Sequence, residues 1–256
     1  MKFKDLREFI AFLEDKGELR RISTTVSRDL EITELADRMV KSGGPALLFE
    51  NVEGSAVPVV IGLFGTHQRV AWALGVDNVE TITDRVRKLL GIAQGPPPGL
   101  MGKLRTAGDL IGLARSQPKI VGSGPCQEVV MEGEDVDLDL LPSLKCWPED
   151  GGRFITLPLV ISRDPDTGTR NVGTYRMQVY DKRTTGMHWQ THKVGAHHLR
   201  AGESAGLDRM EVAVAIGGDP TTIWAGSMPL PPGIDEFAVA GVIREEAVDL
   251  VRCKTV

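Results

Sequence analysis

The sequence predicts an α/β region followed by a β-rich region. Helical and strand-like hydrophobic patterns alternate over the first 90 residues. Residues 94–99, Gln-Gly-Pro-Pro-Pro-Gly, interrupt this alternation, because three prolines fix an extended backbone between flexible glycines. Beyond residue 118, short runs suited to strands are separated by turn-forming clusters. We therefore expect two domains, at residues 1–118 and 119–256.

The first region begins with an amphipathic helix. Asp5 and Glu8 form a capping-box pattern before apolar residues at helical spacing, so a helix is expected at residues 6–13. Residues 30–40 repeat the spacing, and residues 46–49 and 59–63 indicate buried strands. Helical spacing returns at residues 68–74 and 79–90. The alternation of helices and strands indicates an α/β domain.

The second region is expected to be mainly β, after a short helix at residues 109–115. Turn-forming clusters at residues 164–168 and 181–186 indicate an antiparallel meander of the central strands. The last strand pattern reaches Val256 without a turn or cap, so we expect this domain to be incomplete at its C-terminal end. Strands are predicted at residues 127–131, 155–162, 171–180, 187–192, 210–216 and 247–255.

The composition limits the classes of partner and compartment. The net charge of -5 and the absence of a Lys/Arg run argue against nucleic acid as a partner. Three cysteines without a CxxC pair favour a reducing compartment, so a cytoplasmic location is expected. No uninterrupted apolar span is long enough to cross a bilayer.

Polar groups are concentrated in residues 171–193. If residues 171–180 form one strand, Thr174, Arg176 and Gln178 share one face, and Tyr175 and Met177 lie on the opposite face. A guanidinium in such a strand is costly to bury unless it meets an anion. Arg176 therefore pairs either with a structural carboxylate or with the phosphate or carboxylate of a ligand.

Several other residues allow both a structural and a functional interpretation. His188 and His192 stand four apart, but Trp189 occupies the place of the glutamate of a helical zinc motif, so we reject that motif. Asn171 follows a turn, and its carbonyl oxygen would suit Mg²⁺ or Mn²⁺. Residues 226–233 form either a plain connection or a phosphate cradle. Glu236 would ordinarily be a first-turn acid of a helix.

Taken together, these features resemble the UbiD family of prenylated-flavin-dependent decarboxylases. The resemblance extends over essentially the whole chain and does not depend on one short motif. It rests on Asp5-Leu-Arg-Glu-Phe9, Gly17-Glu-Leu19, Leu30-Glu-Ile-Thr-Glu-Leu-Ala-Asp37, Gly43-Gly-Pro-Ala-Leu-Leu-Phe-Glu-Asn51, Cys146-Trp-Pro-Glu-Asp150, Asn171-Val-Gly-Thr-Tyr-Arg176 and Ser227-Met-Pro229.

The resemblance implies a split β-barrel that binds prenylated FMN, with Mn²⁺ or a similar divalent cation and potassium at its phosphate. The implied metal ligands are Asn171, His192 and Glu236, and His192 is preferred to His188 because it precedes the basic residue Lys193. Arg176 matches the family's catalytic arginine, which holds the substrate carboxylate against the flavin. The implied cofactor contacts are Thr174, Tyr175, Arg176, His188, Trp189, Gln190, Lys193, Val194, Ser227, Met228 and Pro229.

The implied reaction is the non-oxidative decarboxylation of an aromatic acid. The preferred substrate is 4-hydroxy-3-polyprenylbenzoate of ubiquinone biosynthesis, and another hydroxyarene carboxylate is the alternative. The family's general acid lies beyond the position of Val256, so a polypeptide that ends here should lose about 10²–10⁴ of its rate. The implied partners are a flavin prenyltransferase, further copies of the chain in a homo-oligomer, and a membrane surface contacted peripherally. Two alternatives are a non-catalytic flavin-binding or assembly module with a separate catalytic subunit, and an ordinary flavin reductase that uses unmodified FMN.

Overall fold

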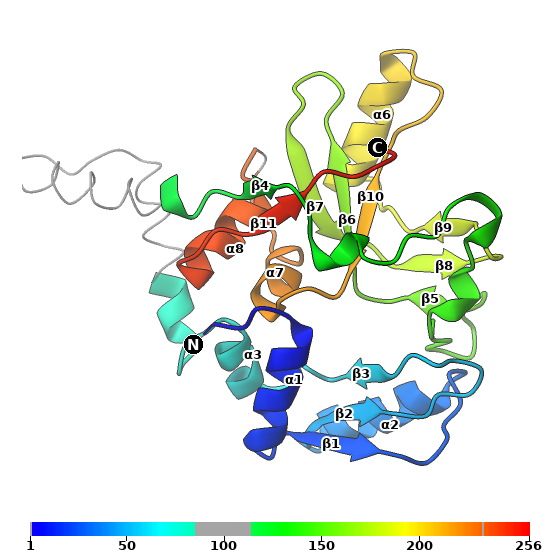
Figure 1. Cartoon of the computed structure of the whole chain (residues 1–256), viewed down its shortest axis with the longest axis vertical. Helices are drawn as coiled ribbons and strands as arrows, with labels where there is room; N and C mark the ends of the chain where they lie inside the picture. Colours follow the sequence, from blue (N-terminus) through cyan, green and yellow to red (C-terminus); the bar gives the residue numbers. More distant parts are fainter. Residues whose placement is uncertain (1, 85–113, 232) are drawn as a thin grey trace, which may run out of the picture.

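A computed structural model describes residues 2–84, 114–231 and 233–256 (Figure 1). The predicted linker at 94–99 and most of the predicted helix at 109–115 lie outside the described residues, as does the second half of the helix predicted at 79–90. None of the described helices is long and apolar enough to cross a membrane.

The N-terminal part is a small α/β unit, as predicted. Asp5 caps α1 by accepting a hydrogen bond from the Glu8 amide at 2.9 Å, and α1 buries Phe9 and Leu13 in the core. The sheet has the order β1-β2-β3, parallel between β1 and β2 and antiparallel between β2 and β3. The elements are α1 (Leu6–Asp15), β1 (Leu19–Ile22), α2 (Glu31–Lys41), β2 (Ala46–Phe49), β3 (Val59–Ile61) and α3 (His67–Ala73).

The described residues of the C-terminal part contain many short strands, three α-helices and three short 3-10 turns. Its two larger sheets are antiparallel, with the orders β10-β6-β7 and β5-β8-β9, and β4 pairs with β11 in parallel. The described strands form no closed barrel. The elements are β4 (Lys119–Val121), η1 (Pro125–Gln127), η2 (Gly133–Asp135), η3 (Leu138–Leu140), β5 (Phe154–Ile155), β6 (Pro158–Arg163), β7 (Arg170–Thr174), β8 (Met177–Val179), β9 (Thr185–Met187), α6 (Val194–Ser204), β10 (Ala213–Ile216), α7 (Pro220–Ala225), α8 (Glu236–Arg244) and β11 (Asp249–Val251).

The strand predicted at residues 171–180 is two strands in two different sheets. β7 ends at Thr174 and β8 begins at Met177, so Tyr175 and Arg176 form a corner between the sheets. The Tyr175 ring folds back over Gly173, where an added Cβ would lie 2.4 Å from the ring. Polar and apolar residues alternate with the same period of two in β7 and in β8. The alternation therefore could not reveal the corner between them.

Two further strand predictions were wrong, and one was too long. Residues 127–131 form no strand, because Pro125 begins the turn η1 and Val129 beyond it is 77% exposed with no neighbouring ladder. The strand predicted at 187–192 includes only Met187 of β9, and residues 188–192 leave the sheet for α6. The strand predicted at 247–255 is β11, which covers only Asp249–Val251.

Helices α7 and α8 lie on the side of the C-terminal part that faces the N-terminal part, and they pack against the α3 region (Figure 1). Ala71 and Leu74 of the α3 region share an apolar cluster with Val239 and Ile243 of α8. The Thr221 hydroxyl of α7 donates to the Ala73 carbonyl oxygen at 2.8 Å. The two parts are therefore joined by a continuous core, and α7 and α8 face β7, where the site residues gather.

Candidate functional site

The corner between β7 and β8 is held by the buried side chain of Tyr175. Its hydroxyl oxygen accepts hydrogen bonds from the Gly195 amide at 3.3 Å and from the Asn171 side-chain amide at 3.4 Å. Gly195 lies in the first turn of α6. The tyrosine thus fixes the corner against the start of α6 and leaves the hydroxyl proton available for another acceptor.

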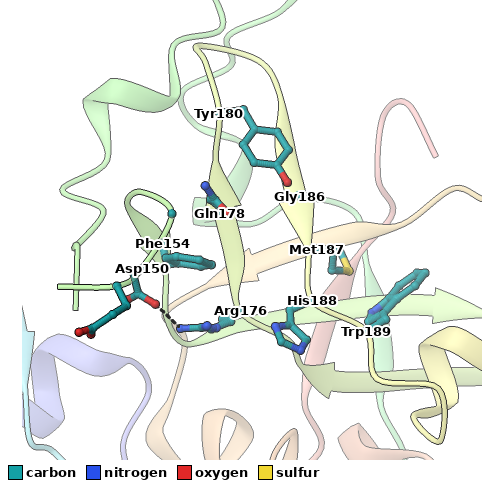
Figure 2. A pocket seen from close by; sticks show the side chains of 11 residues that line it. Asp150, Phe154, Arg176, Gln178, Tyr180, Gly186, Met187, His188 and Trp189 are labelled. Atoms are coloured by element: carbon teal, nitrogen blue, oxygen red, sulfur yellow. Dashed lines mark hydrogen bonds and ion pairs between the residues drawn. The ribbon is translucent and has the colours of Figure 1, made fainter. Parts of the chain in front are cut away.

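Arg176, the predicted catalytic residue, lies at the corner with its guanidinium held on two sides. The group stacks over the Phe154 ring, 4.3 Å from the centroid, and donates to Asp150 Oδ1 at 3.3 Å (Figure 2). The other oxygen of Asp150 accepts from the Trp147 amide at 3.1 Å. The Arg176 side chain remains 41% exposed and that of Asp150 only 9%, so Arg176 has room to bind a second anion.

Arg176 borders a cavity of about 500 Å³ in front of the sheet β5-β8-β9. Arg176 and His188 are linked through the backbone, since the His188 amide donates to the Arg176 carbonyl oxygen at 3.1 Å. A volume of this size is in the range of small-molecule sites. The cavity is lined by Glu149, Asp150, Gly151, Phe154, Arg176, Gln178, Tyr180, Gly186, Met187, His188 and Trp189 (Figure 2).

Trp189 packs edge-on against Tyr175, with ring centroids 6.0 Å apart. Its indole also lies against Gly195, where an added Cβ would be 2.8 Å from the ring, so the close contact requires a glycine. Within the described part of the chain, the indole Nε1 is buried and has no hydrogen-bond partner.

The remaining residues predicted on this segment are more exposed. The Lys193 amide donates to the Gln190 carbonyl oxygen at 3.0 Å, which turns the chain into α6. Lys193 is the N-cap residue of α6, and Val194 is its first helical residue. The exposed Lys193 ammonium therefore lies at the positive end of a helix, which is an arrangement that favours an anion.

The loop that follows α7 reaches the same corner. The Thr174 amide donates to the Gly226 carbonyl oxygen at 3.0 Å, and the Thr174 and Ser227 hydroxyl oxygens are 3.2 Å apart. Met228 instead packs on the apolar cluster of α3 and α8, and Pro229 is exposed. The loop thus presents the Ser227 hydroxyl beside Thr174.

Two of the three predicted metal ligands, Asn171 and Glu236, are buried. Glu236, at the start of α8, accepts a hydrogen bond from the Val172 amide at 2.9 Å, and Val172 directly follows Asn171 in β7. Burial raises the pKa of Glu236, although the Val172 amide opposes this effect. The third residue, His192, is exposed and makes no hydrogen bond or ion pair with either of them among the described residues. The metal assignment stays a prediction.

The sequence reasoning did not single out Asp150 or Phe154 as contacts of Arg176. Asp150 closes the segment Cys146-Trp-Pro-Glu-Asp150 that carried part of the family resemblance, so a signal was present. Phe154 carried no such signal, and the structure shows that it is buried. Neither residue is near Arg176 in sequence, so the contacts depend on the pairing of β5 with β8.

His198 links α6 to the sheet beneath it and gives a testable pH dependence. Its Nδ1 lies 3.0 Å from the Ser162 hydroxyl oxygen, and both residues are buried. Burial lowers the pKa of His198 from 6.5, although Asp164 opposes this effect. The unfolded chain then binds the proton more tightly, so the free energy of unfolding should decrease as the pH falls from 6.5 through the folded-state pKa.

Substituting His198→Asn keeps a polar atom beside Ser162 and removes the titration, so it should flatten this dependence. Denaturant unfolding at several pH values between 5 and 8 measures the effect, with His197→Asn at the exposed neighbouring position as the control. An unchanged slope in His198→Asn would show that another group causes the pH dependence.

Comparisons with known proteins identify the family of the chain. Residues 10–89 match the 3-octaprenyl-4-hydroxybenzoate carboxy-lyase N-terminal domain, and residues 119–256 match the carboxy-lyase Rift-related domain. An uncharacterized protein of Archaeoglobus fulgidus is 51% identical over 256 residues, which are 100% of this chain and 52% of that protein. The chain spans about half the length of the relatives it matches.

Solved structures give the same result. The UbiD-class enzyme HmfF from Pelotomaculum thermopropionicum, in complex with FMN, is 33% identical with a TM-score of 0.81, and the match covers 98% of this chain and 51% of that one. The vanillic acid decarboxylase of Sedimentibacter hydroxybenzoicus is 26% identical with a TM-score of 0.80, over 100% and 52% of the two chains. Since the Rift-related match alone covers more than half of the sequence, the chain belongs to the UbiD family of carboxy-lyases.

Proposed function

We propose that the chain forms the cofactor- and metal-binding part of a decarboxylase that removes the carboxyl group of an aromatic acid with prenylated FMN. The observation that carries this proposal is Arg176, which is half exposed at a 500 Å³ cavity and restrained by Asp150 and Phe154. Structures of the similar enzyme HmfF contain FMN or prenylated FMN, and another similar enzyme is a vanillic acid decarboxylase.

The donor groups at the corner fit such a cofactor. The Thr174 and Ser227 hydroxyl oxygens lie 3.2 Å apart and can each donate or accept a hydrogen bond. Lys193 and the first turn of α6 would hold the phosphate, with Mn²⁺ bound by Asn171, Glu236 and His192, and potassium beside it. When bound, the prenylated flavin supplies an electron sink for the carbon that loses carbon dioxide.

The role of Arg176 is to bind the substrate carboxylate and orient the acid over the cofactor. A guanidinium can hold a carboxylate by two parallel hydrogen bonds, which fixes both position and angle. Phe154 limits its rotation from one side and Asp150 from another, so the group is oriented before substrate arrives.

We further propose 4-hydroxy-3-polyprenylbenzoate of ubiquinone biosynthesis as the substrate, in keeping with the family description. A flavin prenyltransferase would supply the cofactor. The protein would act in the cytoplasm as a homo-oligomer that contacts the membrane surface to reach its substrate, and residues 1–118 and 119–256 would be its domains.

The proposal is tested by co-expressing the full-length gene product with a flavin prenyltransferase, then measuring bound flavin by mass and absorbance, bound metal, and carbon dioxide release from aromatic acids. Bound flavin without carbon dioxide release would favour a non-catalytic flavin-binding module. Unmodified FMN, with no retention of the prenylated form, would favour a flavin reductase.

Two substitutions test the metal site directly. Asn171→Ala removes the amide oxygen, and Glu236→Gln removes the charge while keeping an acceptor for the Val172 amide. Each should reduce bound Mn²⁺ to a small fraction of the wild-type content, measured by elemental analysis. Glu211→Gln, at an exposed position, is the control. Metal content at the wild-type level in both variants would contradict the ligand assignment.

A further inference from the structure

We propose that Arg170 and Asp235 act as a pair of positioning residues that fix β7 and α8 relative to each other, and thereby the spacing of Asn171 and Glu236. This inference rests on the proposed metal site. Neither residue belongs to the predicted site, and neither is proposed to touch the metal, the flavin or the substrate.

The pair stands out because of its place in the sequence and in the fold. Arg170 begins β7 and directly precedes Asn171, while Asp235 is the N-cap residue of α8 and directly precedes Glu236. The Arg170 guanidinium donates to Asp235 Oδ2 across the junction of the two elements. The ion pair thus joins the residues immediately before the two proposed ligands.

Both partners are held in orientation by further contacts. The Arg170 guanidinium lies over the Phe237 ring, 5.0 Å from its centroid. The second oxygen of Asp235 accepts a hydrogen bond from the Phe237 amide at 2.9 Å, which caps α8. Phe237 thus contacts both charged groups, through its ring and through its amide. The Asp235 carboxylate accepts hydrogen bonds from the first turn of α8 and from the guanidinium.

The pair is shielded from water more than a typical surface ion pair. The side chains of Arg170 and Asp235 are 17% and 29% exposed, and Arg170 Nε is buried without a partner among the described residues. Removing one charge would leave the other poorly solvated. The resulting loss of stability should therefore exceed the loss measured for a surface ion pair. Arg170 pairs with Arg163 in the β6–β7 register, so the residue across the ladder is another cation, and Asp235 supplies the anion that Arg170 contacts.

The ion pair and the hydrogen bond from the Val172 amide to Glu236 lie on either side of Asn171 along β7. With both contacts formed, α8 can neither slide along the strand nor rotate about its own N-terminus without breaking one of them. Side chains outside the metal shell that orient its ligands commonly change metal affinity by about 10–100-fold when they are replaced. We place Arg170 and Asp235 at the lower end of that range, because they act through the backbone.

The test uses two variants that remove the charge and keep the local packing. Arg170→Met retains an apolar stem over Phe237, and Asp235→Asn retains a side-chain cap for α8. The full-length, flavin-loaded protein is first treated with a chelator to remove its metal. Mn²⁺ is then added in steps, and the free Mn²⁺ is followed by electron paramagnetic resonance to give the affinity. Each variant should bind Mn²⁺ about tenfold more weakly, and the double variant should lose little more than either one.

Two further variants show that the effect belongs to the pair. Arg170→Lys keeps a positive charge near Asp235 and should restore part of the affinity. Arg163→Met removes the arginine opposite, whose Nη1 donates to the Gly168 carbonyl oxygen at 3.0 Å in the hairpin turn, and should leave Mn²⁺ affinity unchanged.

A second readout needs no metal. Because the pair holds Glu236 against the Val172 amide, hydrogen exchange of that amide in the metal-free protein should be faster in both charge-removing variants. Wild-type Mn²⁺ affinity in Arg170→Met and Asp235→Asn, with Glu236→Gln still losing the metal, would overturn the positioning role and leave the proposed function intact. If Glu236→Gln and Asn171→Ala keep the metal, the proposed site itself fails, and unchanged Val172 exchange would then reject the pair as well.

Discussion

Replacement of Arg176 by Met should lower kcat/KM for decarboxylation by about 10³. The substitution removes the cation that binds the substrate carboxylate, and losing one preorganised hydrogen-bond donor typically costs about 10²–10³ in rate. Loss of substrate orientation over the cofactor adds to that cost. Met also fills the place of the arginine stem over Phe154, so the change acts on charge with little change in packing.

Arg176→Lys separates charge from geometry. Lysine keeps the positive charge but lacks the planar fork that binds a carboxylate through two hydrogen bonds and stacks on Phe154. We therefore expect it to recover only a small part of the lost activity. Initial rates of carbon dioxide release give kcat and KM, and flavin content is measured in the same samples.

Arg183→Met provides the control for Arg176. Arg183 lies between β8 and β9, is exposed, and pairs with Glu134 at 2.5 Å, so its removal takes one positive charge from the same sheet. Its kcat/KM should stay near that of the wild type. Full activity of Arg176→Met with normal flavin content would show that another group binds the substrate carboxylate.

Local signals in the sequence account for most of the N-terminal part. Asp5 and Glu8 predicted the start of α1, and the apolar run 46–49 predicted β2, because capping and burial depend on neighbouring residues. β1 was missed because Arg20 and Arg21 break its apolar pattern and its stability comes from pairing with β2. Strand pairing is a property of the fold and cannot be read from the strand alone.

The proposed metal and cofactor residues were assigned only through the family resemblance. Residues alone favoured a turn role for Asn171 and a first-turn role for Glu236. The structure bears out only the second, because Asn171 lies inside β7, and both side chains are buried. The contact of Glu236 with the Val172 amide depends on α8 returning to β7, which no local pattern encodes. His192 shows the converse. Its position in the sequence resembled that of a metal ligand, but its side chain is exposed.

Gly241→Ala should lower the free energy of unfolding by at least about 2 kcal/mol. Gly241 lies in α8, where alanine would normally stabilise a helix by about 1 kcal/mol over glycine. An added Cβ, however, would lie 2.0 Å from the Ser116 carbonyl oxygen and 3.3 Å from that of Glu246. Both neighbours are backbone atoms, so relief requires a movement of the chain, and overpacking of this kind costs about 1–3 kcal/mol or more.

Gly202→Ala is the matched control, since Gly202 is a buried glycine in α6 whose added Cβ would meet only Leu207, at 3.6 Å. That distance is an ordinary van der Waals contact, so the helix preference for alanine should prevail and raise the stability by up to about 1 kcal/mol. Denaturant unfolding of both variants should therefore show a lower free energy of unfolding for Gly241→Ala and a higher one for Gly202→Ala. Equal effects would mean that α8 does not pack against Ser116 as closely as described, and α8 is the helix that carries Glu236 to β7.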